Sequence, residues 1–314
     1  MTSEITLFVN PTAGRGRGAH AAQPAARVLR EAGFAVRTVV GTDAGDALAR
    51  AREAVAGGTG ALVAVGGDGM ASLALQAVAG TGTPLGVVAV GTGNDIARAL
   101  ELPVRDPAGA GRVIAEALKA GHGRTVDLGR VGGRWFGSVL ASGFDSRVND
   151  RGNRMRWPAG RLRYDIAMLA ELAGLRTVPY RITLDDGPAL ETEATLVAVG
   201  NGPSYGGGMR ICSGARLDDG LLDVTVVGEC SRTTLLRVFP RVYRGTHLGH
   251  PAVTVHRAAR VTLEARGVTG YADGEPLGSL PLTAEAVPRA VRVLTAPAPA
   301  TPPTTSPTTP STTP

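Results

Sequence analysis

The chain has 314 residues, of which 43% are hydrophobic and 19% charged, enough for two globular domains with sizeable cores. Its net charge of +6 favours anionic partners such as a nucleotide, nucleic acid or an acidic bilayer, although arginine-rich genome composition explains the charge equally well. Two cysteines, Cys212 and Cys230, exclude a disulfide framework and have no Cys or His partners at zinc spacing.

The first part of the chain alternates between apolar strands and helices. Strands are predicted at residues 5–9, 35–40, 61–65 and 85–90. Helices are predicted at 21–32, 46–56 and 71–79, with another after residue 95, and a glycine-rich turn is predicted at 14–18. The alternation predicts parallel βαβ units, so we assign residues 1–125 to an α/β nucleotide-binding domain with a parallel sheet.

From about residue 125 the pattern changes to short strands separated by turns. Strands are predicted at 126–131, 135–141, 180–184, 195–199, 222–227, 252–255 and 261–264, with one helix at about 162–174. We therefore expect a mainly β C-terminal domain over residues 126–295. Residues 296–314 contain only Ala, Pro, Ser and Thr, a composition typical of a disordered tail.

Two glycine loops follow the third and fourth strands, where ligands of open α/β sheets bind. They read GGDG at residues 66–69 and GTGND at residues 91–95. Glycines let backbone amides approach phosphates closely, and Asp68 is a suitable Mg²⁺ ligand. A tight turn with Asp68 as the helix cap would explain the first loop alone. Two such loops on adjacent units favour a nucleotide cradle.

A third glycine-rich segment, NPTAGRG at residues 10–16, follows the first strand. It fits a loose dinucleotide fingerprint, but no acidic residue ends the second strand as in a Rossmann dehydrogenase. Lys119 is the only lysine and stands in neither a Walker A loop nor a protein-kinase motif. GPSYG at 202–206 matches a hydrolase nucleophile elbow, but the glycines at 206–208 disfavour the required helix. Phosphoryl transfer would then depend on loop amides, Mg²⁺ and arginine.

The three loops resemble the diacylglycerol kinase catalytic domain family, which includes sphingosine kinases, ceramide kinases and bacterial lipid kinases. The resemblance continues through VDLG at 126–129, GNG at 200–202, DDGLLD at 218–223 and DGEP at 273–276. Each motif is short, but seven of them in this order between residues 5 and 295 are specific.

The resemblance implies ATP and Mg²⁺ in a cleft between an NAD-kinase-like α/β domain and a mainly β-sandwich domain. It implies acidic cleft residues at Asp68, Asp95 and Asp127, of which Asp68 and Asp127 are expected to be catalytic, and a general base at Glu275. By position, it implies that the nucleotide contacts are Asn10, Thr42, Gly66, Gly67, Asp68, Gly69, Thr92, Asn94 and Asp95. It also implies a second Mg²⁺ site, which orders the β domain, at Asp219 with the carbonyls of Arg216 and Leu221.

The chain departs from the family pattern beside the first glycine loop. Met70 stands where the family usually has Thr, and Leu73 and Ala74 fill a region that often holds Glu. Loss of the Thr hydroxyl implies weaker ATP binding or compensation by another group. The role assigned to Glu275 also depends on the presence of the other motifs, because the DGE sequence taken alone is more typical of a solvated hairpin turn.

Six arginines cluster near two aromatic residues in the second domain: Arg147, Arg151, Arg154, Arg156, Arg161 and Arg163, near Trp157 and Tyr164. The cluster suits an anionic membrane surface, and a solvated helix face explains it equally well. The sequence shows neither a secretory signal nor an apolar span, so we expect a cytoplasmic protein with peripheral membrane contact. No nucleic-acid-binding module is recognised, and a homodimer is left open.

The leading prediction is therefore phosphorylation of diacylglycerol to phosphatidic acid at the expense of ATP. The alternatives are another lipid alcohol (a sphingoid base or ceramide), NAD as the acceptor, or a non-catalytic lipid- or nucleotide-binding regulator. The segments at 218–223 and 273–276 argue against NAD kinase, and Met70 motivates the regulator.

Overall fold

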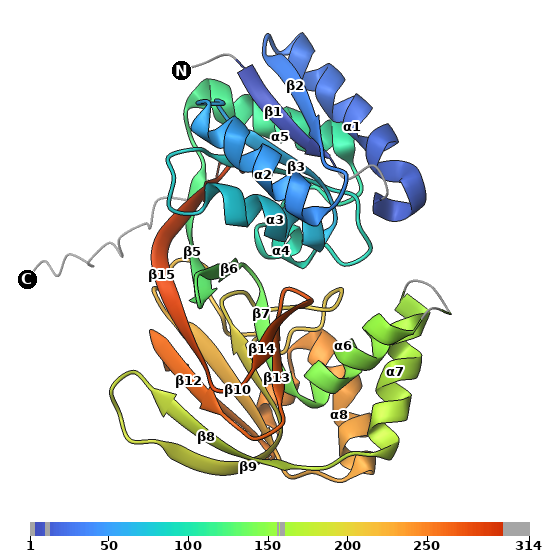
Figure 1. The fold of residues 1–314 in the computed structure, drawn as a ribbon, viewed down its shortest axis with the longest axis vertical. Helices are drawn as coiled ribbons and strands as arrows, with labels where there is room; N and C mark the ends of the chain where they lie inside the picture. Colours follow the sequence, from blue (N-terminus) through green and yellow to red (C-terminus); the bar gives the residue numbers. More distant parts are fainter. Residues whose placement is uncertain (1–3, 10–12, 156, 158–160, 298–314) are drawn as a thin grey trace, which may run out of the picture.

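The computed structural model describes residues 4–9, 13–155, 157 and 161–297, with the backbone alone for 13–19 and 161–165. The N-terminal domain is built from β1 (Glu4–Val9), α1 (Ala13–Glu31), β2 (Ala35–Val40), α2 (Ala44–Ala56), β3 (Leu62–Gly66), α3 (Asp68–Val78), β4 (Leu85–Ala89), α4 (Asp95–Ala99) and α5 (Pro107–Ala120). Its strands run parallel in the order β4-β3-β1-β2. This confirms the predicted α/β domain with a parallel sheet (Figure 1).

Helices cover both faces of this sheet because successive side chains of a strand point to opposite sides. Ile5, Leu7 and Val9 pack against α1 and α5, whereas Phe8 packs against α2 and α3. The carboxyl ends of β3 and β4 lead directly into the two glycine loops. The sheet therefore brings both loops to one edge, which faces the second domain in Figure 1.

The predicted turn at residues 14–18 is wrong, because α1 already begins at Ala13. Each glycine in a helix interior costs about 1 kcal/mol of helix stability relative to alanine, but tertiary packing routinely overrides this propensity. Here α1 packs along α5 as well as on the sheet. The helix predicted at 21–32 is α1 and begins eight residues earlier, at Ala13, while the other predicted elements have ends shifted by at most three residues.

The C-terminal domain is mainly β. Its strands are β5 (Arg124–Val131), β6 (Arg134–Phe136), β7 (Val139–Gly143), β8 (Val178–Leu184), β9 (Leu190–Gly200), β10 (Leu222–Gly228), β11 (Val253–Ala258), β12 (Arg260–Glu264), β13 (Thr269–Ala272), β14 (Glu275–Ser279) and β15 (Leu282–Val293). Its helices are α6 (Phe144–Arg154), α7 (Arg161–Ala173), α8 (Arg232–Arg244) and the 3₁₀ turn η1 (His247–Gly249). The predicted β-rich domain is confirmed, while α6, α8 and β13 to β15 were not predicted.

The predicted strand at 135–141 is two strands, β6 and β7, separated by Gly137 and Ser138. The strands enclose one apolar core, and α6, α7 and α8 pack over a second one on the other side of β7 and β9. α6 and α7 lie side by side on one flank of the C-terminal domain, with α8 next to them (Figure 1). None of the described helices is long and apolar enough to span a bilayer.

The two domains are joined by the antiparallel pair β5 and β15. β15 pairs with β12 in the C-terminal domain, and its last residue, Val293, pairs with Leu85 of β4. Ala290, Val291 and Val293 pack into the core of the N-terminal domain. The chain thus leaves the N-terminal domain along β5 and returns to it along β15 (Figure 1).

Candidate active site

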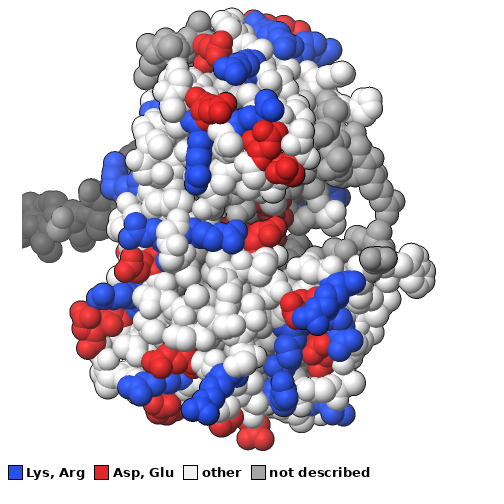
Figure 2. All heavy atoms as spheres, viewed as in Figure 1, with Lys and Arg blue, Asp and Glu red and all other residues white. Residues whose placement is uncertain are grey.

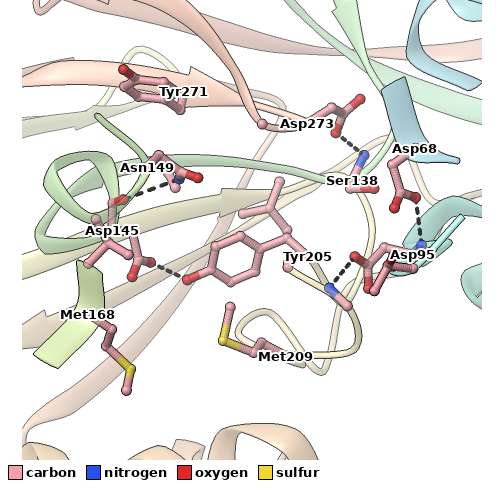
Figure 3. Close-up of a pocket in the computed structure, with 18 of the residues that line it drawn as sticks. Asp68, Asp95, Ser138, Asp145, Asn149, Met168, Tyr205, Met209, Tyr271 and Asp273 are labelled. Atoms are coloured by element: carbon pink, nitrogen blue, oxygen red, sulfur yellow. Dashed lines mark hydrogen bonds between the residues drawn. The ribbon is translucent and has the colours of Figure 1, made fainter. Parts of the chain in front are cut away.

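A cavity of about 370 Å³ lies between the two domains and is lined by both of them. One end is polar and is formed by Asp68, Thr92, Gly93, Asp95 and Asp273. The other end is apolar and is formed by Phe144, Val148, Met168, Phe239 and Tyr243, from α6, α7 and α8. One continuous space therefore joins the glycine loops to an apolar pocket (Figure 3).

Asp68 occupies the first turn of α3 and fastens the first glycine loop to the second. Its two carboxylate oxygens accept hydrogen bonds from the backbone amides of Asn94 and Asp95, both at 2.7 Å. Burial raises the pKa of Asp68, and the charge of Asp95 raises it further. The loops approach closely through glycine, since a Cβ at Gly91 would lie 2.5 Å from the Cα of Gly67.

Asp95 is 4% exposed and fastens the N-terminal domain to the C-terminal domain. Its carboxylate accepts hydrogen bonds from the backbone amides of Gly207 and Gly208, again at 2.7 Å each. These glycines belong to the loop between β9 and β10. Figure 3 shows Asp95 between Asp68 and this loop.

The predicted nucleotide contacts of the second loop differ in role. Asn94 is buried in a left-handed conformation (φ 59°), and its side-chain amide bonds to the backbone of Gly91 in both directions, at 2.9 Å. Asn94 therefore holds its own loop. Thr92 is exposed and lines the cavity, so its hydroxyl is available to a ligand.

Asp273 also lines the polar end, and the sequence interpretation gave it no role. It sits in the turn between β13 and β14 with Gly274, both at positive φ (49° and 87°). Its oxygens accept the amides of Gly137 (2.8 Å) and Ser138 (2.9 Å). Burial raises its pKa to about 6 despite these bonds, with a further contribution from the charge of Asp68. The Asp-Gly pair between two strand-like runs is the local signal for this hairpin turn.

Glu275, the predicted base, begins β14 directly after this turn. It is exposed and is not among the residues that line the cavity. Its charge contributes to the raised pKa of Tyr271, which does line the cavity. Glu275 therefore lies beside the polar end rather than within it.

Asp127 is 4% exposed and lies on β5, outside the cavity lining. Its carboxylate accepts the amides of Gly220 (2.7 Å) and Arg289 (2.8 Å). It thereby joins three segments at the junction of the domains: β5, the loop before β10, and β15. This geometry favours a structural role over the predicted catalytic one.

The second Mg²⁺ site was predicted at Asp219 with the carbonyls of Arg216 and Leu221. In the structure an arginine side chain already supplies a positive charge there. One oxygen of Asp219 pairs with the guanidinium of Arg257, and the other accepts the amide of Leu221 at 3.2 Å. Arg257 also bonds Asp223 at 3.0 Å. The described residues contain no cluster of three or more Asp, Glu, His or Cys side chains suited to a metal. The geometry therefore favours Arg257 as the counter-charge here.

The other predicted contacts among the described residues do not line the cavity. Gly66 ends β3, Gly67 precedes α3 and Gly69 lies in its first turn. Thr42 is exposed outside the cavity lining, and its hydroxyl bonds Asp46 at 3.2 Å. Asn10 lies outside the described residues. The side chain of Met70 is buried in the N-terminal core, so it does not replace a hydroxyl in the cavity.

A polar pair lies toward the apolar end of the cavity, where Figure 3 shows Asp145 near Met168. The hydroxyl of Tyr205 donates to the carboxylate of Asp145, which lies in the first turn of α6. Burial raises the pKa of Asp145 to about 6, partly offset by this bond and by Arg147. The hairpin that contains Tyr205 continues into positive-φ glycines rather than a helix, so the structure offers no nucleophile elbow at Ser204.

The described arginines of the predicted cluster are paired with acids. Arg147 and Arg151 pair with Glu171, and Arg154 pairs with Asp150. Figure 2 shows positive and negative groups intermixed over α6 and α7. Arg156 and the side chains of Arg161, Arg163 and Tyr164 lie outside the described residues. The most exposed apolar side chains near these helices are those of Trp157 (81%) and Leu169 (57%).

Four aspartates of this region share one arrangement: each carboxylate accepts two backbone amides, one on each oxygen. They are Asp68, Asp95, Asp127 and Asp273. A carboxylate oxygen has a second lone pair, so those in the cavity can still bind a cation or a water molecule. The polar end can thus hold Mg²⁺ through one or two carboxylates together with the phosphates of a substrate, which is the ligand set Mg²⁺ prefers.

Comparisons with known proteins identify the families of both domains. The diacylglycerol kinase catalytic domain matches residues 4–131, and the YegS C-terminal NAD kinase beta sandwich-like domain matches residues 138–295. A diacylglycerol kinase of Mycobacterium tuberculosis is 46% identical over 93% of this chain and 94% of its own length. A diacylglycerol kinase of Staphylococcus aureus is 29% identical over 90% of this chain and 89% of its own.

Solved structures share the fold. A Bacillus anthracis diacylglycerol kinase superimposes with a TM-score of 0.72 at 24% identity, covering 94% of this chain and 97% of that one. An Archaeoglobus fulgidus NAD kinase in complex with ATP gives a TM-score of 0.53 at 12% identity, covering 94% of each chain. These two likenesses concern the fold alone. Both domain matches and the close similarity to the mycobacterial kinase show that this chain belongs to the diacylglycerol kinase family.

Proposed function

We propose that the protein transfers the γ-phosphate of ATP to the free hydroxyl of diacylglycerol and forms phosphatidic acid. The observation that carries this proposal is the two-ended cavity, which joins a carboxylate-rich glycine edge to an apolar pocket. A substrate with a hydroxyl at one end and hydrocarbon at the other fits such a space. Lipid-binding sites need apolar lining with a few placed polar groups, and this cavity has both.

The polar end would hold the triphosphate of the donor ATP and is called the donor end. The apolar end would hold the lipid acceptor and is called the acceptor end, or acceptor half. The amides at the start of α3, around Gly67 and Gly69, and the hydroxyl of Thr92 would contact its phosphates. A Cβ at Gly93 would lie 2.5 Å from an oxygen of Asp68, so only glycine leaves this cradle open. Bound Mg²⁺ would neutralise charge on the phosphates, and Asp68 and Asp95 would hold it.

The acceptor hydroxyl needs a base, because a primary alcohol is a weak nucleophile at neutral pH. We assign this role to Glu275, which follows the Asp273–Gly274 turn at the polar end. Asp273 itself is the competing candidate, since its pKa near 6 suits proton transfer at neutral pH. The two hydrogen bonds that Asp273 accepts from backbone amides favour a positioning role for this carboxylate, which would hold the turn against Gly137 and Ser138.

We further propose that the protein works in the cytoplasm and reaches its lipid by peripheral contact with an anionic membrane. Trp157 and Leu169 are exposed near α6 and α7, and Met168 of α7 lines the apolar end of the cavity. Insertion of these apolar side chains into the bilayer would carry the contact, because the described arginines are already paired. Replacing Leu169 by Glu should weaken co-sedimentation with anionic vesicles but spare turnover of a short-chain diacylglycerol in solution. Equal co-sedimentation of the variant and the wild type would refute this contact.

A sphingoid base is the second candidate acceptor. The carboxyl of Asp145 in the acceptor half of the cavity would attract its ammonium group, whereas diacylglycerol carries no charge. The decisive experiment incubates labelled ATP and Mg²⁺ with diacylglycerol, sphingosine, ceramide, NAD or no acceptor. We expect phosphatidic acid as the main product. Phosphorylated NAD, a phosphorylated sphingoid base as the main product, or no lipid-dependent ATP consumption would each overturn the proposal.

A further inference from the structure

A hairpin in the loop between β9 and β10 touches both ends of the cavity. It is closed by a bridge between Tyr205 and Met209, and its three glycines have φ values of 60°, 85° and 106°. The backbone amides of Gly207 and Gly208 hold Asp95 at the donor end. The hydroxyl of Tyr205 holds Asp145 at the acceptor end. Figure 3 shows Tyr205 between these two carboxylates.

The two sides of the hairpin are joined at its base, where Tyr205 and Met209 exchange backbone hydrogen bonds of 3.1 and 3.0 Å. Only Gly206 separates Tyr205 from the first of the two amides, and Gly207 lies in contact with the second glycine loop, since a Cβ on Gly93 would lie 3.5 Å from the Cα of Gly207. A displacement of Tyr205 together with its backbone would therefore be passed to the two amides. Packed segments of this kind shift as units, which is how coupling passes between neighbouring sites.

We infer that Tyr205 is a positioning residue that couples occupancy of the acceptor half of the cavity to the placement of Asp95 at the donor half. This inference rests on the proposed function. An acceptor lipid that fills this half of the cavity displaces Tyr205 and weakens the bond from its hydroxyl to Asp145. The hairpin then shifts, and with it the two amides on Asp95. Nucleotide and acceptor thereby change each other's affinity, as reciprocal linkage requires.

The test measures this coupling without turnover. The affinity for a non-hydrolysable ATP analogue with Mg²⁺ is titrated with and without a saturating diacylglycerol analogue whose free hydroxyl is methylated. In the wild type we expect the lipid to change the nucleotide Kd by about fivefold or more, the lower end of usual coupling. In Tyr205→Phe, which keeps the ring and removes only the donor, the change should fall below about twofold.

Two further variants make the result specific. Asp145→Ala removes the acceptor of this bond and should also abolish the coupling. Tyr271→Phe is the matched control, because Tyr271 lines the same cavity and donates to Asp150 at 2.7 Å but does not belong to the hairpin. This control should keep the coupling of the wild type.

The outcomes separate the inference from the proposed function. Wild-type protein that phosphorylates diacylglycerol but shows no coupling overturns the inference and leaves the function standing. The same holds if Tyr205→Phe keeps the coupling, or if Tyr271→Phe loses it to the same extent. Wild-type protein that transfers no phosphate to any lipid overturns the proposed function itself.

Discussion

Replacing Asp127 by Asn should destabilise the fold rather than remove a catalytic group. The carboxylate is 4% exposed and accepts two amides, from Gly220 and Arg289, at 2.7 and 2.8 Å. Asparagine keeps one acceptor oxygen and turns an NH₂ donor toward the second amide. One charged hydrogen bond is lost and a buried donor is left unpaired, which costs roughly 2–4 kcal/mol. For a protein of this size, the melting temperature should fall by on the order of 10 °C.

The assay pairs thermal unfolding with kcat measured well below the melting temperature. We expect Asp127→Asn to melt early while its folded fraction keeps a kcat within about tenfold of the wild type. Asp218→Asn is the matched control: its partner Arg124 lies 3.0 Å away, both side chains are 40% exposed, and such pairs contribute about 1 kcal/mol or less. Normal melting of Asp127→Asn with a loss of kcat of about 10²-fold or more would refute this reasoning and restore the catalytic role predicted from sequence.

Three further predictions concern the site and its surroundings. Glu275→Gln should melt like the wild type and bind ATP normally, with kcat lower by roughly 10²–10⁴-fold; retention of more than about a tenth of kcat would move the base to Asp273. Burial raises the pKa of Asp273 to about 6, so the folded state holds this proton more tightly than the unfolded chain. The proton on Asp273 stabilises the folded state fully below about pH 4, and this stabilisation is lost as the pH rises through 6. The measured quantity is the unfolding free energy of the wild type minus that of Asp273→Asn, which should decrease over this range by up to roughly 3 kcal/mol. A difference that does not change with pH would contradict the raised pKa of Asp273. Without nucleotide, the wild type should melt at the same temperature in Mg²⁺ and in EDTA, whereas Arg257→Ala should melt earlier and respond to Mg²⁺; a Mg²⁺-dependent shift in the wild type would restore the metal site predicted at Asp219.

The elements of the N-terminal domain could be predicted because their signals are local. Strands of five or six residues end at Asn-Pro after β1 and at glycine after β2, β3 and β4, and a helix follows each of them within a few residues, so the periodicity changes over a short stretch. The same locality places GGDG and GTGND on one edge of a parallel sheet. The start of α1 was missed because three glycines within six residues outweigh, in sequence, a helix that packing on α5 stabilises.

The roles of the aspartates could not be read from the sequence because their partners are distant in it. Asp273 bonds amides about 135 residues away, and Asp95 bonds amides about 112 residues away. A motif shows that a carboxylate is present at a position, but whether it faces a ligand or a backbone amide is decided by tertiary packing. Met70 shows the same limit. A methionine where the family usually has Thr suggests a functional change in the sequence, but in the structure its side chain is buried in the core.

Helices α6 and α8 were missed for a different reason. α6 reads FDSRVNDRGNR, a polar sequence with an internal glycine, and α8 contains Pro240. Each presents only a few apolar side chains to the second core of the C-terminal domain, Phe144 from α6 and Val242 from α8 among them. The apolar end of the cavity is made largely by these helices, so the sequence indicated a lipid substrate only through the family resemblance and not through its pocket.

The return of β15 to the N-terminal sheet has a consequence for synthesis on the ribosome. Leu85 at the edge of β4 is paired by Val293, and the amide of Leu294 donates to the carbonyl of Leu85 at 2.8 Å. Until residue 294 has left the exit tunnel, this edge lacks its partner, and the core lacks Ala290, Val291 and Val293. An unpaired edge strand is a template for association between chains. The nascent N-terminal domain therefore lacks these contacts at Leu85 and in its core until almost the whole chain has been made, and a fragment that ends at residue 125 would never acquire them.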